Sequence, residues 1–140
     1  MRISVEIAPG ELLDKLTILE IKAERIADPQ LLRHIATERA TLEQARRRHI
    51  ADTREIRRLC ALLKTINERL WVIEDRIRAH ERAGDFGVGF IKLARAVYIT
   101  NDRRFAIKRR INQLLNTDIA EAKGYVSAHQ ARQPVRPQPD

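Results

Sequence analysis

An aliphatic repeat between residues 56 and 77 constrains the fold of this chain more than any other feature of its sequence. An Ile or Leu recurs at every third or fourth position over several helical turns. The positions are Ile56, Leu59, Leu63, Ile66, Leu70, Ile73 and Ile77. This spacing places the side chains on one face of a long α-helix, as in antiparallel bundles and coiled coils. We therefore predict a helix over residues 52–82 whose apolar face packs against other helices.

A second apolar stripe predicts a helix from residue 9 or 10 to residue 26. Its members, again three or four positions apart, are Leu12, Leu16, Leu19, Ala23 and Ile26. Leu13, Ile18 and Ile21 lie elsewhere on the same helix. Because apolar residues surround much of its circumference, we expect neighbours to cover this helix on more than one side.

The next helix boundaries are marked by capping residues. Asp28 followed by Pro29 is typical of a helix start, with Asp as the N-cap and Pro in the first turn, and predicts a helix over residues 29–48. A break near residues 51–53 is expected, because Asp52 or Thr53 can cap a new helix there. An unbroken helix through this point is the alternative.

Three glycines, Gly84, Gly87 and Gly89, predict a turn, after which a fourth helix runs over residues 88–116. A short final turn over residues 117–122 should end at Gly124. The apolar face of the fourth helix holds Phe90, Ala94, Val97, Phe105, Ile111 and Leu115. Polar residues interrupt the middle of this face, which costs free energy unless they find partners.

Residues 2–7 alternate between apolar and polar side chains, with Ile3, Val5 and Ile7 on one side. Period two is typical of a short β-strand with one buried face. A single strand must pair with something, because an open edge leaves N–H and C=O groups unpaired. The partner could be the same strand of a second subunit or part of the C-terminal tail. We accordingly expect a homodimer.

Together these patterns predict an all-α fold, an antiparallel bundle of long helices with a short N-terminal β-strand. Frequent charged residues and few Gly and Pro fit helical composition. Residues 1–125 should form a single helical domain. Residues 126–140, which contain Pro134 and Pro137 and no apolar periodicity, should form a disordered tail.

Polar rows beside the apolar stripes are the best functional clue. Packing the stripes together should gather these rows into one interhelical layer. The residues expected in this layer are Lys15, Lys22, Asn67, Trp71, Glu74, Arg78, Asn101, Arg104, Lys108 and Asn112. Cations outnumber acids in this set, and Arg and Lys bind carboxylates and phosphates through charge-assisted hydrogen bonds. The layer is therefore either a ligand-binding site for an anionic small molecule or a closed structural network that fixes helix register.

Other classes of site find little support in the sequence. His34, His49, His80 and His129 lack metal-ligand spacing, and no motif for a nucleophile, nucleotide or other cofactor is present, so we expect no metal and no cofactor. The single cysteine, Cys60, excludes an internal disulfide. With no apolar run long enough to span a membrane and no visible signal peptide, we expect no membrane partner and a cytoplasmic location.

The net charge of +8 raises the alternative of nucleic-acid binding. Arg46–Arg48 and the basic cluster within residues 103–110 could contact a phosphate backbone. No nucleic-acid-binding motif or interleaved aromatic residues accompany these clusters, so this is the least favoured interpretation.

Four segments resemble an uncharacterised bacterial family of small helical proteins, a domain-of-unknown-function family. They are PGELLDKLTILEIK (9–22), LWVIEDRIR (70–78), YITNDRR (98–104) with Ile107-Lys108 and Ile111-Asn112, and EAKGY (121–125). The resemblance covers most of residues 1–125 and implies no activity. It implies a loose link to surface-polysaccharide metabolism, because members are similar to proteins encoded near glycosyltransferases.

A weaker likeness is to the all-helical chorismate mutases, which bind a dicarboxylate between helices through Arg and Lys. The arginine expected early in their first helix is missing here, where Lys15 and Lys22 stand instead. We interpret the chain first as a small helical binding or scaffold protein. The alternative is a small helical enzyme acting on an anionic metabolite, with Lys or Arg stabilising negative charge and Glu74 as acid or base.

Overall fold

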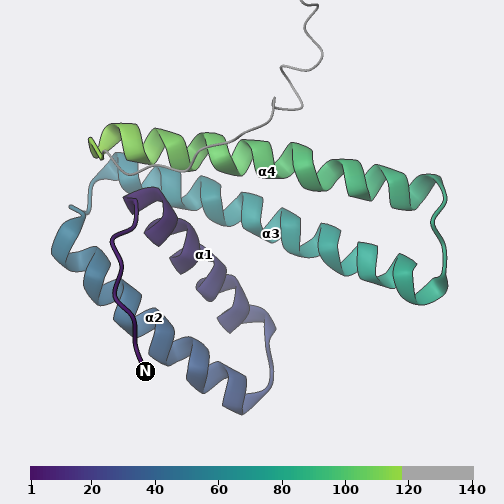
Figure 1. The fold of residues 1–140 in the computed structure, drawn as a ribbon, viewed down its shortest axis with the longest axis horizontal. Coiled ribbons are helices and arrows are strands. Elements are labelled where there is room, and N and C mark those ends of the chain that lie inside the picture. Colours follow the sequence, from purple (N-terminus) through teal and green to yellow (C-terminus); the bar gives the residue numbers. More distant parts are fainter. Residues whose placement is uncertain (118–140) are drawn as a thin grey trace, which may run out of the picture.

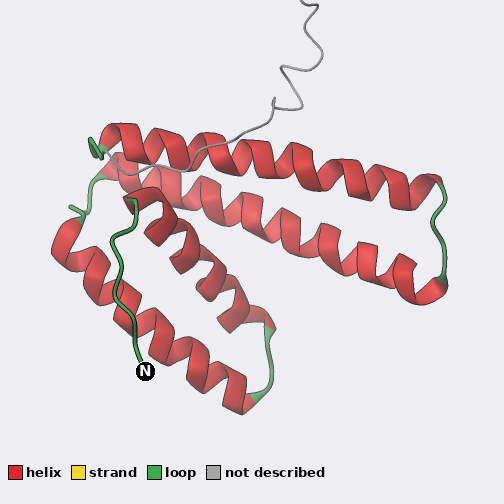
Figure 2. Cartoon of the chain, in the orientation of Figure 1, coloured by secondary structure: helices red, strands yellow, loops and turns green. Residues whose placement is uncertain are grey.

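The described part of the chain is helical from residue 9 onward. The structure, a computed structural model, describes residues 1–117 of the 140. It contains α1 (Pro9–Arg25), α2 (Pro29–His49), α3 (Arg54–Ala83) and α4 (Val88–Leu114), joined by short loops (Figure 2). The predicted all-α class is thus confirmed. The turn predicted over residues 117–122, apart from Thr117, and the tail lie outside the described residues.

Side-chain caps fix the starts of α2 and α3. The Asp28 carboxylate accepts hydrogen bonds from the Gln30 and Leu31 amides at 2.8 and 3.2 Å. The Thr53 hydroxyl oxygen accepts from the Ile56 amide at 3.2 Å, so Thr53 rather than Asp52 caps α3. These caps satisfy amide donors that have no partner within the helix. The expected break between α2 and α3 is therefore present.

The four helices form two hairpins, α1 with α2 and α3 with α4 (Figure 1). Helix α1 packs against the other three helices, whereas α2 packs against α1 alone. This differs from the single antiparallel bundle expected from the sequence. The physical reason lies in α2, where Ile35 is the one fully buried residue among 21. Its charged surface leaves too little apolar area to cover the α3–α4 hairpin as well.

The core lies where α1 crosses the α3–α4 hairpin. Its buried members come from α1, α3, α4 and the loop before α3. They are Leu12, Leu13, Leu16, Ile50, Ile56, Leu59, Leu63 and Ile111. Leu13 and Ile21, outside the main α1 stripe, are each only 1% exposed. Helix α1 is therefore covered on more than one side, as its sequence predicts.

The N-terminal strand predicted over residues 2–7 is absent from the described chain. Residues 1–8 contain neither helix nor strand and run as a loop ahead of α1 (Figure 2). Ile3 and Val5 are 79% and 74% exposed. The alternation of residues 2–7 predicts one buried face. No second strand exists in residues 1–117 to supply the backbone hydrogen bonds that a strand needs, and both faces remain open to solvent.

Candidate functional site

A buried carboxylate, that of Asp14 in α1, lies at the centre of a polar layer between α1, α3 and α4. Asp14 is 1% exposed. Arg104 of α4 donates to it from Nε, at 3.0 Å to Oδ1 and 3.1 Å to Oδ2. A further bond runs from Arg104 Nη2 to Oδ2. This fork-like arrangement is the strongest and most directional form of carboxylate–guanidinium pairing.

Two neutral side chains complete the surroundings of this carboxylate. The Asn67 amide on α3 donates to Asp14 Oδ1 at 2.8 Å and to Thr17 Oγ1 at 2.9 Å. The Thr17 hydroxyl in turn donates to the Asp14 backbone carbonyl at 2.7 Å. Asn67 of α3 and Arg104 of α4 thus bind the same carboxylate of α1, which connects the three helices.

A second ion pair closes the layer. Lys108 of α4, which is buried, lies 2.7 Å from Glu11 Oε2 and 3.9 Å from Asp14 Oδ2. Two acids, Glu11 and Asp14, therefore face two cations, Arg104 and Lys108, and their formal charges cancel. Among the described residues, no buried side-chain nitrogen or oxygen lacks a hydrogen-bond partner. The layer is electrically balanced without any ligand.

Next to this layer, α1 and α4 approach so closely that only glycine fits between them. The Gly10 amide donates to Asn112 Oδ1 at 2.8 Å. A Cβ atom at Gly10 would lie 2.6 Å from the Lys108 carbonyl oxygen and 2.8 Å from Asn112 Oδ1. The polar layer and the helix crossing therefore depend on each other.

Of the ten residues expected in the layer, four lie there: Asn67, Arg104, Lys108 and Asn112. Lys15 instead pairs with Glu38 of α2 at 3.1 Å, and Glu74 pairs with Arg78 at 3.9 Å on the exposed side of α3. Trp71 lies under Arg25, whose guanidinium carbon is 6.0 Å from the ring centroid.

The two remaining residues, Lys22 and Asn101, are half-buried and lie outside the hydrogen-bond network that the described residues form around Asp14. The sequence interpretation missed Asp14 and Thr17 as members of the layer. The available signal was an acid within the most apolar part of α1, flanked by Leu12, Leu13 and Leu16.

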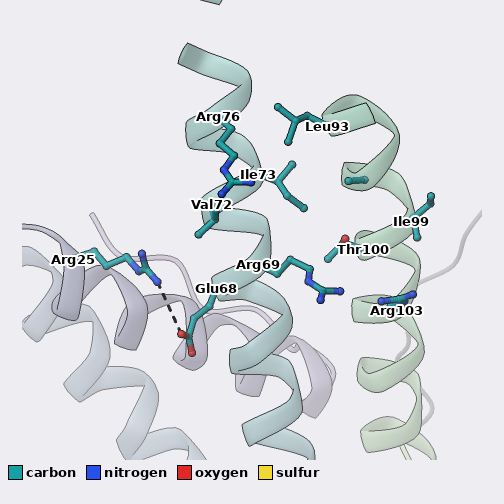
Figure 3. Close-up of a pocket in the computed structure, with 11 residues that line it drawn as sticks. Arg25, Glu68, Arg69, Val72, Ile73, Arg76, Leu93, Ile99, Thr100 and Arg103 are labelled. Carbon is teal, nitrogen blue, oxygen red and sulfur yellow. Dashed lines mark ion pairs between the residues drawn. The ribbon is translucent and has the colours of Figure 1, made fainter. Parts of the chain in front are cut away.

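A groove of about 690 Å³ opens beside the polar layer, between the end of α1 and the facing sides of α3 and α4 (Figure 3). Its walls alternate between cationic and aliphatic side chains. The lining residues are Arg25, Glu68, Arg69, Val72, Ile73, Arg76, Leu93, Ala96, Ile99, Thr100 and Arg103. We call this the arginine groove.

The charge of the arginine groove is strongly unbalanced. Four arginines line it, and the one carboxylate among its lining residues, that of Glu68, lies 3.9 Å from Arg25. In Figure 3 the Arg69 side chain extends from α3 toward α4, where Arg103 lies. Like charges held in one groove repel, so an anion placed among them would gain both attraction and relief of that repulsion.

The lining also contains aliphatic surface, from Val72, Ile73 and Leu93 among others. On α4, Leu93, Ala96 and Ile99 recur at every third residue and form one stripe along the groove, whereas the two aliphatic residues from α3 are neighbours in the sequence. The buried Thr100 adds a hydroxyl. Chemically, the groove can bind an anionic group and cover an attached apolar part.

Comparison with known protein families places the chain. A family model described as a family of unknown function (DUF6165) matches residues 3–136. The chain belongs to DUF6165. No curated protein and no solved structure is similar enough to count as a match.

A second pocket of this DUF6165 chain, about 590 Å³, lies between α1 and α2. Acids and bases both line it, and Arg46 pairs there with Glu43 at 3.1 Å. Cys60 reaches its edge from α3, and burial raises the pKa of its thiol. Since the thiolate is the reactive form, Cys60 is a poor nucleophile at neutral pH.

Two further features of this DUF6165 chain concern metals and membranes. Within residues 1–117, no three His, Cys, Asp or Glu side chains are grouped as a metal site requires. None of the helices in that range combines the length and apolar character needed to cross a bilayer.

Proposed function

We propose that this DUF6165 chain is a non-catalytic binding protein that holds an anionic ligand in the arginine groove. The observation that carries the proposal is the charge of the lining, four arginines against one half-exposed glutamate already paired with Arg25. Arginine binds phosphate and carboxylate in a bidentate manner. The four charges of the polar layer within residues 1–117 cancel in pairs, so the layer offers no surplus charge to a ligand.

The aliphatic part of the lining narrows the class of ligand. A bare inorganic anion would leave Val72, Ile73 and Leu93 in contact with water, whereas an anion carrying a ring or alkyl part would cover them. We therefore favour an organic phosphate or carboxylate over a simple ion. Sugar nucleotides belong among the first probes, because the family resemblance suggests a link to surface-polysaccharide metabolism.

A binding role is favoured over an enzymatic one by the chemistry of the side chains in the groove. Its single carboxylate, Glu68, faces Arg25, and its single hydroxyl, Thr100, has no histidine or lysine among the lining residues to activate it. Glu74, the acid or base considered from the sequence, lies outside the groove and pairs with Arg78.

Isothermal titration calorimetry tests the proposal. The titrants are inorganic phosphate, a dicarboxylate, butyl phosphate and a sugar nucleotide. The double variant Arg69→Gln/Arg103→Gln should weaken binding of the best titrant by about tenfold or more, since each charge-assisted bond contributes roughly 1.5–3 kcal/mol. The matched control, Arg33→Gln/Arg48→Gln, removes two exposed arginines from α2 and should leave the Kd unchanged.

Equal weakening in both double variants would show a non-specific effect of net charge and would overturn the proposal. Heat of binding from none of the four titrants would overturn it as well. Product analysis after incubation separates the roles, because a binding protein returns the ligand unchanged.

A further inference from the structure

The segment ahead of α1, residues 2–7, exposes aliphatic side chains to solvent, and its backbone groups lack hydrogen-bond partners in the described chain. Ile3 and Val5 are 79% and 74% exposed, and Ile7 is 44% exposed. Backbone groups of residues 2–7 make no hydrogen bond to other backbone groups in the described chain. Exposed aliphatic residues at alternate positions, together with unpaired backbone N–H and C=O groups, are typical of an edge strand that can pair with a second strand.

The same segment is complementary to itself when two copies run in opposite directions. In one register Ser4 lies opposite Ser4 of the second copy, and the two-fold axis passes between them. Arg2 then lies opposite Glu6, and Ile3 opposite Val5, each pair occurring twice. Because side chains alternate along a strand, the ion pairs share one face and the aliphatic pairs the other.

Neighbouring registers are worse. A shift by one residue places Ile3 opposite Glu6 and Arg2 opposite Ile7, so polar and apolar side chains meet. A shift by two residues keeps the aliphatic pairing and separates Arg2 from Glu6. Neither Arg2 nor Glu6 forms an ion pair within residues 1–117, and both are exposed. Both charges are therefore available to a second copy.

We propose that residues 2–7 of two copies of this chain pair as an antiparallel two-stranded ribbon and so form a homodimer, with Arg2 of each copy opposite Glu6 of the other. The occupant is a second copy because this segment is complementary to itself in the antiparallel direction, with opposite charges facing each other and aliphatic residues facing each other. An isolated two-stranded ribbon is marginally stable. The dimer is consequently weak and depends on protein concentration.

Charge reversal tests the pairing without disturbing the helical core. Arg2→Glu alone puts carboxylate opposite carboxylate, and Glu6→Arg alone puts guanidinium opposite guanidinium. Each should weaken dimerisation about fivefold or more in sedimentation velocity, since both opposed pairs of the ribbon become like-charged. An equimolar mixture of the two variants should dimerise as well as the wild type. Arg33→Glu, an exposed reversal on α2, is the matched control.

Disulfide trapping tests the register. In a Cys60→Ala background, Ser4→Cys should cross-link two copies readily, because residues directly opposite lie about 4.5–5.5 Å apart at Cα. Val5→Cys should cross-link poorly, because the two-residue offset exceeds the roughly 7 Å limit. A monomer at every concentration, a dimer unaffected by either charge reversal, or faster cross-linking of Val5→Cys would each overturn the proposal.

Discussion

Asp14 and Arg104, 90 positions apart in the sequence, form a bidentate ion pair that joins α1 to α4 in the interior of the protein. Asn67 and Lys108 surround the same carboxylate, so three helices meet at one charge. Burying a charge is costly unless its partners are also buried and well oriented. The arrangement therefore fixes the helix crossing beside which the arginine groove opens.

Removing the charge of Asp14 while keeping its shape should destabilise the fold strongly. Asp14→Asn removes the buried negative charge that faces Arg104 and Lys108. We expect a loss of about 3 kcal/mol in the free energy of unfolding. Urea denaturation measures this value. The control is Asp75→Asn, an exposed change on α3 that should stay within about 0.5 kcal/mol. Similar values for the two variants would contradict a structural role for the layer.

The close approach of α1 and α4 predicts that alanine is not tolerated at position 10. In Gly10→Ala the new Cβ would meet the Lys108 carbonyl oxygen at 2.6 Å, so the helices must separate. We expect a loss of about 2 kcal/mol, as for other overpacked sites.

Gly89→Ala is the matched control for this change. There the Cβ meets only the end of the His80 ring, at 3.2 Å, which can move aside. Because alanine also favours the helical conformation, Gly89→Ala should be neutral or slightly stabilising. Thermal melting of both variants distinguishes a local clash from a general effect of removing glycine.

Loss of the Thr53 cap should weaken the start of α3. Thr53→Ala deprives the Ile56 amide of its acceptor, and the expected cost is about 1 kcal/mol in the free energy of unfolding. Thr65→Ala, at an exposed position inside α3 where the hydroxyl bonds to the Ala61 carbonyl, should cost nothing. If both variants lost equal stability by urea denaturation, the cap would have no special role.

The Cys60 thiol should react slowly in the folded protein. Burial raises the pKa of this thiol, so less thiolate is present at a given pH. Iodoacetamide at pH 8 should modify native Cys60 far more slowly than the urea-unfolded chain.

The same pKa difference makes stability depend on pH. Because the thiol of the unfolded chain ionises at lower pH than that of the folded protein, the contribution of Cys60 to the free energy of unfolding is lost as the pH rises. Cys60→Ala should flatten that alkaline decline, and an unchanged decline would assign it to other groups.

Helix positions could be predicted from the sequence because their determinants are local. Aliphatic spacing, the Asp28-Pro29 start and the break at Thr53 act within a few residues, and each matches the structure. The arrangement of α2 could not be predicted in this way. A stripe shows which side of a helix is apolar, but how many neighbours can cover it depends on the rest of the fold.

Only the residues that α3 and α4 contribute to the polar layer could be predicted from the sequence. Lys108 and Asn112 interrupt an apolar stripe and Asn67 and Arg104 border one, so a position between helices could be expected for all four. Their main partner, Asp14, lies in the most apolar part of α1, but its burial could not be predicted from that position alone, because it depends on α1 being covered by three helices. The arginine groove was missed for the same reason, since Arg69 and Arg103 face each other only once α3 and α4 are packed.

Arginine side-chain NMR tests the account most directly. Nε–Hε signals of the uniformly labelled protein, assigned with single Arg→Gln variants, would be followed during titration with butyl phosphate and a sugar nucleotide. The account predicts saturable shifts at Arg25, Arg69, Arg76 and Arg103, with Arg33 and Arg48 unmoved. No shift with either ligand, or equal shifts at all exposed arginines, would contradict a built anion site between α3 and α4.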